Sequence, residues 1–179
     1  MRKILLLVSL LALSWGSYGQ ESRQERALAR KNHLMIDPIV LIAGPILNVS
    51  YERALNEDLG VGLHSLLGLG AMDEMVQFSP FARFYLGGSH GAGFFMEGFV
   101  PVTNMEDDYQ TYNPEGDYYT IVRDKKTSVG LGIGLGGKWL LKRNLMLEVS
   151  GGIGRKLINK GVHSESITGK WMIGFGYAF

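Results

Sequence analysis

The last twelve residues of this 179-residue chain alternate between bulky apolar side chains and mostly small ones. The bulky residues stand at odd positions, as Trp171, Ile173, Phe175, Tyr177 and Phe179, and the even positions between them hold Met172, Gly174, Gly176 and Ala178. Successive side chains of a β-strand point to opposite faces, so this pattern predicts a strand with one broad apolar face. Such a strand can meet lipid on one side and a crowded interior on the other.

The same kind of alternation recurs along most of the chain. Eight segments of about ten residues are predicted as strands, at 34–43, 46–55, 59–70, 76–86, 92–102, 127–140, 145–158 and 168–179. About ten residues is the length that a tilted strand needs to cross a bilayer. A sheet in lipid must also close on itself, because an open edge would leave backbone groups without hydrogen bonds. We therefore predict an all-β fold over 34–179, an eight-stranded antiparallel up-and-down transmembrane β-barrel.

The N-terminus predicts export. Arg2 and Lys3 precede an apolar run at 4–13, and Ser17 and Gly19 supply the small residues of a cleavage site, so 1–19 is predicted to be a cleaved signal peptide. An uncleaved membrane anchor is the alternative, but the apolar run is shorter than the roughly 20 residues that span a bilayer. The charged segment 20–33 is predicted to be flexible. With no cysteine, the chain is neither a lipoprotein nor a disulfide-stapled fold.

The connections between the predicted strands fall into two kinds. Those at 56–58, 87–91 and 142–144 are short and rich in turn-forming residues, whereas 71–75, 103–126 and 159–167 are longer or more polar. Outer-membrane barrels have short periplasmic turns and longer outside loops, so we expect the two kinds at opposite ends of the barrel. The tight Gly44-Pro45 connection is an exception, because this scheme assigns it to the outer side.

Alternation also predicts which polar residues face inward. It places Glu52, Arg83, Glu97 and Glu148 inside on four different strands, among glycines and serines. We predict that Arg83 pairs with at least one of these glutamates, because a guanidinium can serve two carboxylates at once. In the alternative, the four residues lie at different heights and trapped water solvates each of them. A soluble lipocalin-like barrel would have the reverse polarity, with an apolar interior.

The segment 103–126 carries most of the candidate binding residues. Its carboxylates are Glu106, Asp107, Asp108, Glu115 and Asp117, and its tyrosines are Tyr109, Tyr112, Tyr118 and Tyr119. Exposed tyrosines could contact an extracellular protein or a glycan, and clustered carboxylates could bind calcium, although their spacing fits no EF-hand. A merely hydrated acidic loop is the simplest interpretation. The near-neutral charge, 18 Lys and Arg against 17 Asp and Glu, argues against nucleic acid as a partner.

Three short motifs match catalytic or cofactor patterns. The glycines of 132–137 fit a dinucleotide fingerprint, and 87–91 fits a nucleophile elbow, but each motif requires a following helix and neither has one. His163, Ser164 and Glu165 bring a base, a hydroxyl and a carboxylate together, yet adjacent residues do not form a triad by proximity in sequence alone. We therefore predict no cofactor, no metal site and no catalytic residue.

Taken together, residues 34–179 resemble a family of small eight-stranded outer-membrane β-barrels of unknown function and, more loosely, the OmpA, OmpX and OmpW types. Residues 48–55, followed by a turn and then by 60–63, are similar to the second and third strands of that family. The resemblance implies a Gram-negative outer membrane, with its lipid as surroundings and Phe179 as the signal read by the barrel assembly machinery. It implies a non-enzymatic structural or surface-interaction role. The alternative is an enzyme that modifies acyl chains of lipid A or phospholipid.

Overall fold

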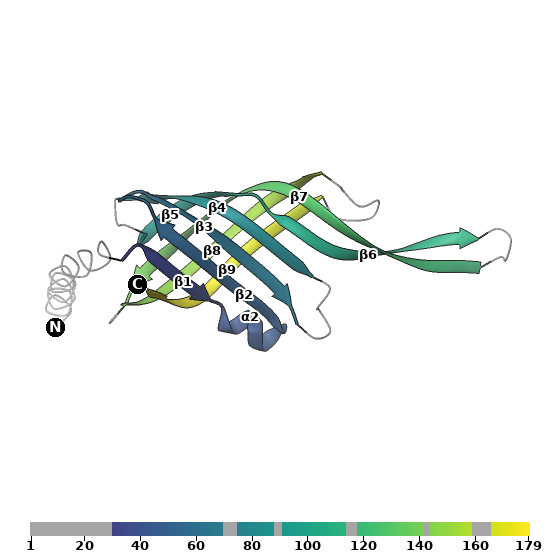
Figure 1. Ribbon diagram of the computed structural model, residues 1–179, viewed down its shortest axis with the longest axis horizontal. Coiled ribbons are helices and arrows are strands. Elements are labelled where there is room, and N and C mark those ends of the chain that lie inside the picture. The colour runs from purple at the N-terminus through teal and green to yellow at the C-terminus, as the bar shows by residue number, and fades with distance from the viewer. Residues whose placement is uncertain (1–29, 70–74, 88–90, 114–117, 142–143, 159–165) are drawn as a thin grey trace, which may run out of the picture.

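The computed structural model describes residues 30–69, 75–87, 91–113, 118–141, 144–158 and 166–179, and within them it leaves out the side chains of 106–124 (Figure 1). The predicted signal peptide and residues 20–29 of the segment predicted to be flexible lie outside these residues. The first strand, β1, starts at Asn32, two residues before the predicted start at 34.

Antiparallel strands make up almost the whole described chain (Figure 1). In chain order the elements are β1 (Asn32–Ile36), α2 (Pro38–Ala43), β2 (Ile46–Ala54), β3 (Leu59–Gly68), β4 (Val76–Leu86), β5 (Gly93–Phe99), β6 (Val102–Asn113), β7 (Tyr118–Leu140), β8 (Leu145–Ile158) and β9 (Ile167–Ala178). The last strand, β9, pairs with β1, so the sheet closes on itself. None of the helices in the described ranges is long and apolar enough to cross a membrane.

Nine strands make an eight-stranded wall because β5 and β6 share one position. Both pair antiparallel with β4 on one side and with β7 on the other. The two strands are separated at Val100 and Pro101, where proline has no N–H to give to a ladder. The backbone still holds there, because the Val100 N–H donates to the Pro80 carbonyl at 3.0 Å and the Pro101 carbonyl accepts from the Gly130 N–H at 2.9 Å. The predicted fold class, an eight-stranded antiparallel barrel, is confirmed.

The first predicted strand, 34–43, is wrong in its second half. The strand stops at Ile36, and α2 takes up Pro38–Ala43. The cause is local, since Asp37 Oδ1 accepts from the backbone N–H groups of Ile39 and Val40 and so caps the helix, with a proline in its first turn. The apolar run after Asp37 has the composition of a strand, but its capping residues make it a helix.

The segment 103–126, expected to be a loop, is instead mostly a hairpin. Strands β6 and β7 pair from Val102↔Val129 out to Asn113↔Tyr118, and the ribbon extends well beyond the barrel (Figure 1). The sequence holds a physical reason, because tyrosine, threonine, valine and isoleucine dominate both arms near the tip and are strong strand formers. The acidic residues at the base of the segment concealed this pattern.

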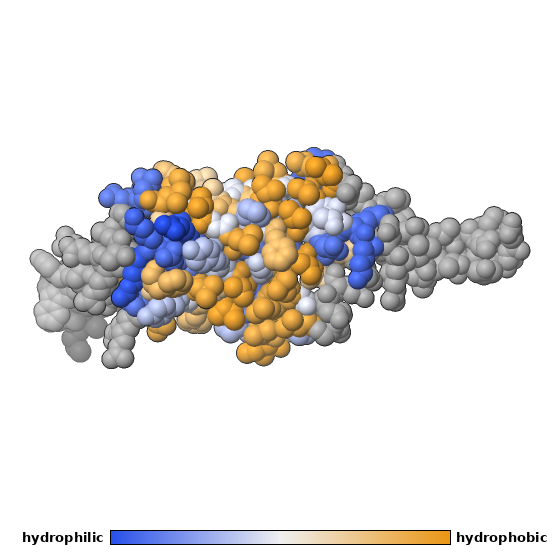
Figure 2. All heavy atoms as spheres, viewed as in Figure 1, coloured by the Kyte–Doolittle hydropathy of each residue, from blue (hydrophilic) through white to orange (hydrophobic). Residues whose placement is uncertain are grey.

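The outer face of the barrel wall is apolar, whereas the inner face carries buried charged and polar side chains together with apolar ones. Ile133 and Ile153 are each 72% exposed, and a band of hydrophobic residues crosses the middle of the molecule between hydrophilic ends (Figure 2). On β9, Trp171 and Phe175 face outward while Met172 and Ala178 are buried, which confirms the alternation predicted for the last twelve residues. The charged side chains that the next section describes lie on the inner face.

Candidate functional site

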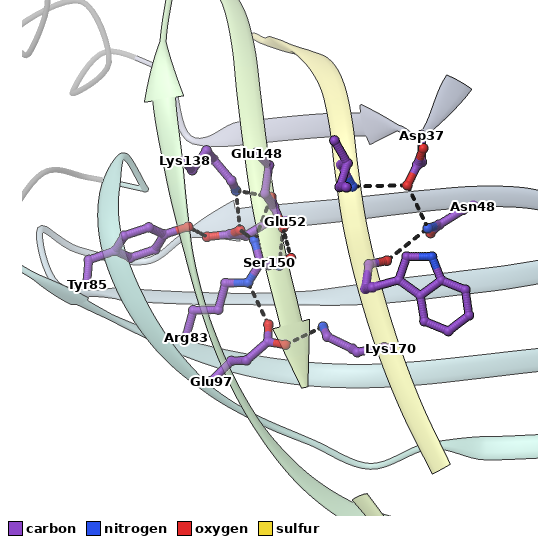
Figure 3. Close-up of polar contacts among 12 residues, drawn as sticks. Asp37, Asn48, Glu52, Arg83, Tyr85, Glu97, Lys138, Glu148, Ser150 and Lys170 are labelled. Carbon is purple, nitrogen blue, oxygen red and sulfur yellow. Dashed lines mark hydrogen bonds and ion pairs between the residues drawn. The ribbon is translucent and has the colours of Figure 1, made fainter. Parts of the chain in front are cut away.

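Arg83 lies at the centre of a buried ion-pair network in the barrel interior (Figure 3). From β4, its Nε donates to Glu97 Oε2 of β5 at 2.9 Å, and one Nη donates to Glu52 Oε2 of β2 at 2.7 Å. Glu148 of β8 accepts two hydrogen bonds from the guanidinium, at 2.6 and 2.9 Å. The structure thus brings together the four residues that alternation places inside. One arginine serves three carboxylates, and the Glu148 pair has the bidentate geometry that favours guanidinium over ammonium.

Two lysines complete the network. Lys138 of β7 contacts Glu52 and also lies 3.5 Å from Glu148, and Lys170 of β9 lies 3.0 Å from Glu97. Sequence reasoning missed both residues, although the signal was available. Lys138 continues the even-numbered inward series of β7, and Lys170 continues that of β9.

The network is electrically balanced. It contains three cations and three carboxylates, whose side chains are at most 1% exposed. Hydroxyl groups use further carboxylate lone pairs, with Tyr85 donating to Glu52 at 2.6 Å and Ser150 to Glu148 at 2.9 Å. Buried charges are costly unless they are paired and hydrogen-bonded, and here each charge has an opposite partner.

Aromatic rings and glycines shape the space around these charges. The guanidinium carbon of Arg83 lies 4.4 Å from the ring centre of Phe81 and 4.2 Å from that of Phe95. Such stacking favours the cation where water is excluded. On β7, a Cβ at Gly134 would come within 2.8 Å of Glu97 Oε1. The glycine run of β7 therefore makes room for the network, and it occurs inside a strand as expected, which leaves the dinucleotide pattern without its helix.

The other predicted residues belong to the β6–β7 hairpin, to the C-terminus or to parts of the chain outside the described residues. The β6–β7 hairpin contains the backbones of Tyr109, Tyr112, Tyr118 and Tyr119, and Tyr112 pairs with Tyr119. The structure does not describe their side chains. His163, Ser164 and Glu165 also lie outside the described residues. Phe179 is 54% exposed, and its backbone exchanges two hydrogen bonds with Asn32. Among the residues that the structure describes, no group of His, Cys, Asp and Glu is arranged to hold a metal ion.

A second set of polar side chains closes a seam between β2 and β9. Backbone pairing of β1 with β9 ends at Ile36↔Phe175, and beyond this point α2 packs against β2 and β9. Asp37 Oδ2 accepts from the Ile173 N–H at 3.0 Å, and Asn48 donates to the Trp171 carbonyl at 2.9 Å (Figure 3). These contacts, drawn from side chains, take the place of strand–strand hydrogen bonds that β1 would otherwise supply.

The fold is similar to that of a solved structure. The crystal structure of the N-terminal β-barrel domain of Pseudomonas aeruginosa OprF matches 84% of this chain and 98% of its own, with a TM-score of 0.56 and 14% sequence identity. At this identity the likeness shows the fold alone, which agrees with the predicted resemblance to small eight-stranded barrels. No protein-family model and no curated protein matches the sequence.

Proposed function

We propose that this protein is a non-enzymatic outer-membrane β-barrel, exported by its N-terminal signal and embedded in lipid through its apolar outer face. The observation that carries the proposal is the polarity of the wall. Apolar side chains such as Leu131, Ile133 and Leu135 are 59%, 72% and 68% exposed, whereas six ionic side chains are buried inside. In water this outer face would be a large exposed apolar surface, which is unfavourable. In a bilayer it contacts hydrocarbon.

The proposed orientation follows from the connections. Short turns join β2 to β3, β4 to β5, and β7 to β8 at the barrel end that also holds the C-terminus, and the β6–β7 hairpin projects from the opposite end (Figure 1). Short turns are periplasmic in outer-membrane barrels. The hairpin then reaches into the cell exterior.

The interior supports a structural rather than a channel role. An eight-stranded barrel has just enough room for its own side chains. Here Arg83, Lys138 and Lys170 bind carboxylates across the lumen from β4, β7 and β9, so the cross-section at this height is filled by paired charges. We propose that the network stabilises the barrel wall.

The hairpin is the proposed interaction element. A two-stranded ribbon that leaves the barrel lacks the further strands or core that make such a ribbon stable in water. Contact of the tyrosine-bearing segment 103–126 with an extracellular protein or glycan would supply that stabilisation. We propose this as the surface role of the protein.

Cell fractionation and gel mobility test the proposal together. The protein is expected in outer-membrane fractions and should migrate differently before and after boiling, because a closed barrel keeps its hydrogen-bonded strands in detergent. Deleting Phe179 should lower the outer-membrane yield if the assembly machinery reads this residue, while Phe94→Leu, another exposed aromatic position, is the control. A periplasmic, soluble protein with one gel mobility contradicts the proposed location.

A further inference from the structure

The lipid-facing side of the barrel carries a groove over β7, β8 and β9. Its volume is about 620 Å³, and its walls include Leu131 and Ile133 of β7, Ile153 and Arg155 of β8, and Ile167 of β9. The register sets Ile133 opposite Ile153 and Leu131 opposite Arg155, so the charged Arg155 lies next to a pair of isoleucines along the strands. The groove is therefore an apolar depression on the outer face of the wall, and Arg155 is the one cation among the residues that line it.

Arg155 has no partner of its own within the described part of the chain. None of the described residues forms a hydrogen bond or an ion pair with its guanidinium, and its neighbours across the strands, Leu131 and Ile167, are apolar. This contrasts with Arg83, which binds three carboxylates inside the barrel. A cation beside hydrocarbon that has no partner among the described residues is suited to an anion supplied from outside.

The height of Arg155 limits what that anion can be. Arg155 lies ten positions beyond Leu145, where β8 begins at the short-turn end. With about 3.3 Å of rise per residue and a tilt of about 40°, ten positions span roughly 25 Å of membrane, the height of a barrel's apolar band. In the proposed orientation, Arg155 lies at the outer boundary of the hydrocarbon, and Ile133 and Ile153 lie below it.

We infer that this groove binds one molecule of the phosphorylated glycolipid of the outer leaflet, lipid A, with an acyl chain against Ile133 and Ile153 and a phosphate at Arg155. The chemistry matches at both ends of the groove. A guanidinium donates two parallel hydrogen bonds to phosphate oxygens, and the isoleucines offer a hydrocarbon surface to the chain. This inference rests on the proposed outer-membrane location and orientation, and it adds a specific lipid site to them.

Lipid binding to the purified full chain in detergent tests the inference. Native mass spectrometry compares retention of lipid A with retention of the same lipid after its phosphates are removed. We expect Arg155→Gln to weaken lipid A binding about tenfold, the loss that corresponds to about 1.4 kcal/mol. Arg53→Gln is the matched control, because Arg53 is exposed on β2 near the short-turn end. This variant should bind lipid A as the wild type does. The dephosphorylated lipid should bind the wild type as weakly as lipid A binds Arg155→Gln.

A second pair of variants tests the apolar part of the groove. Ile153→Trp should fill the groove and lower lipid A retention at least fivefold, whereas Val149→Trp, on the same face of β8 outside the groove, should leave retention unchanged. A mobility shift on unheated gels establishes that each variant is folded. Equal retention by the wild type, Arg155→Gln and Ile153→Trp overturns the lipid site, as does equal binding of both lipids. Because binding is measured in detergent, a protein that fractionates with the outer membrane but fails this test loses only the site.

Discussion

At the scale of single residues, Arg83 is the cation on which the buried network depends. Its replacement by methionine leaves Glu52, Glu97 and Glu148 with only two lysines for three charges. Removing one partner from a buried ion pair costs about 3–5 kcal/mol, so Arg83→Met should lower the free energy of unfolding by about that amount. Chemical denaturation in lipid vesicles, followed by tryptophan fluorescence, measures the effect.

A double variant separates lost pairing from lost packing. Arg83→Met with Glu97→Gln removes the one carboxylate charge left in excess, so it should recover part of the stability, while Arg53→Met at an exposed position should cost little. If Arg83→Met unfolds at the wild-type denaturant midpoint, the network does not stabilise the barrel.

Sequence alternation predicted that these charged side chains lie on the inner face, but it did not predict their contacts. Period two assigns Arg83 and Glu148 to the interior without stating their heights. Their hydrogen bonds join β4 to β8, which are not neighbours in the wall, so they depend on how the sheet closes and how its strands are staggered. Lys138 and Lys170 could have been found from parity alone, because each extends an inward series already identified on its strand.

At the scale of elements, the seam between β2 and β9 depends on one carboxylate. Oδ1 of Asp37 caps α2, and Oδ2 accepts from the Ile173 N–H and, at 3.4 Å, from Asn48 Nδ2. An asparagine has one oxygen, so Asp37→Asn can keep either the cap or the seam contacts but not both. We expect it to cost about 1–3 kcal/mol, the range for a buried donor left unsatisfied. Asp37→Ala should cost about 1 kcal/mol more, because it loses both the helix cap and the seam contacts.

Hydrogen exchange of the Ile173 amide locates the effect at the seam. Exchange at Ile173 should accelerate in Asp37→Ala more than exchange at Val149, which lies within the β8–β9 ladder. Asp58→Asn, in the exposed turn between β2 and β3, is the matched control and should change neither. Unchanged protection at Ile173 in Asp37→Ala would mean that the side chain is not what holds the seam.

Sequence reasoning erred at this element and at the hairpin for a shared reason. It read the apolar residues of 38–43 as a strand and the charged residues of 103–126 as a loop, using side-chain polarity in both places. The outcome depended instead on capping at Asp37 and on strand propensity combined with backbone pairing in β6 and β7. Polarity reports what surrounds a segment, whereas capping and pairing determine its backbone.

At the scale of the whole molecule, the arrangement of connections predicts how the barrel is oriented in the proposed outer membrane. The β6–β7 hairpin and the β4–β5 turn lie at opposite ends, because one strand position of the wall, β5 with β6, separates them. An epitope inserted between Asn113 and Tyr118 should therefore bind antibody on intact cells, whereas one inserted between Gly87 and Gly91 should require permeabilised cells. Both insertions fall between paired strands and not within them, so both variants should keep the mobility shift of a closed barrel. Labelling of the β4–β5 insertion alone on intact cells would invert the orientation and place Arg155 at the inner leaflet, where the proposed lipid A site has no ligand.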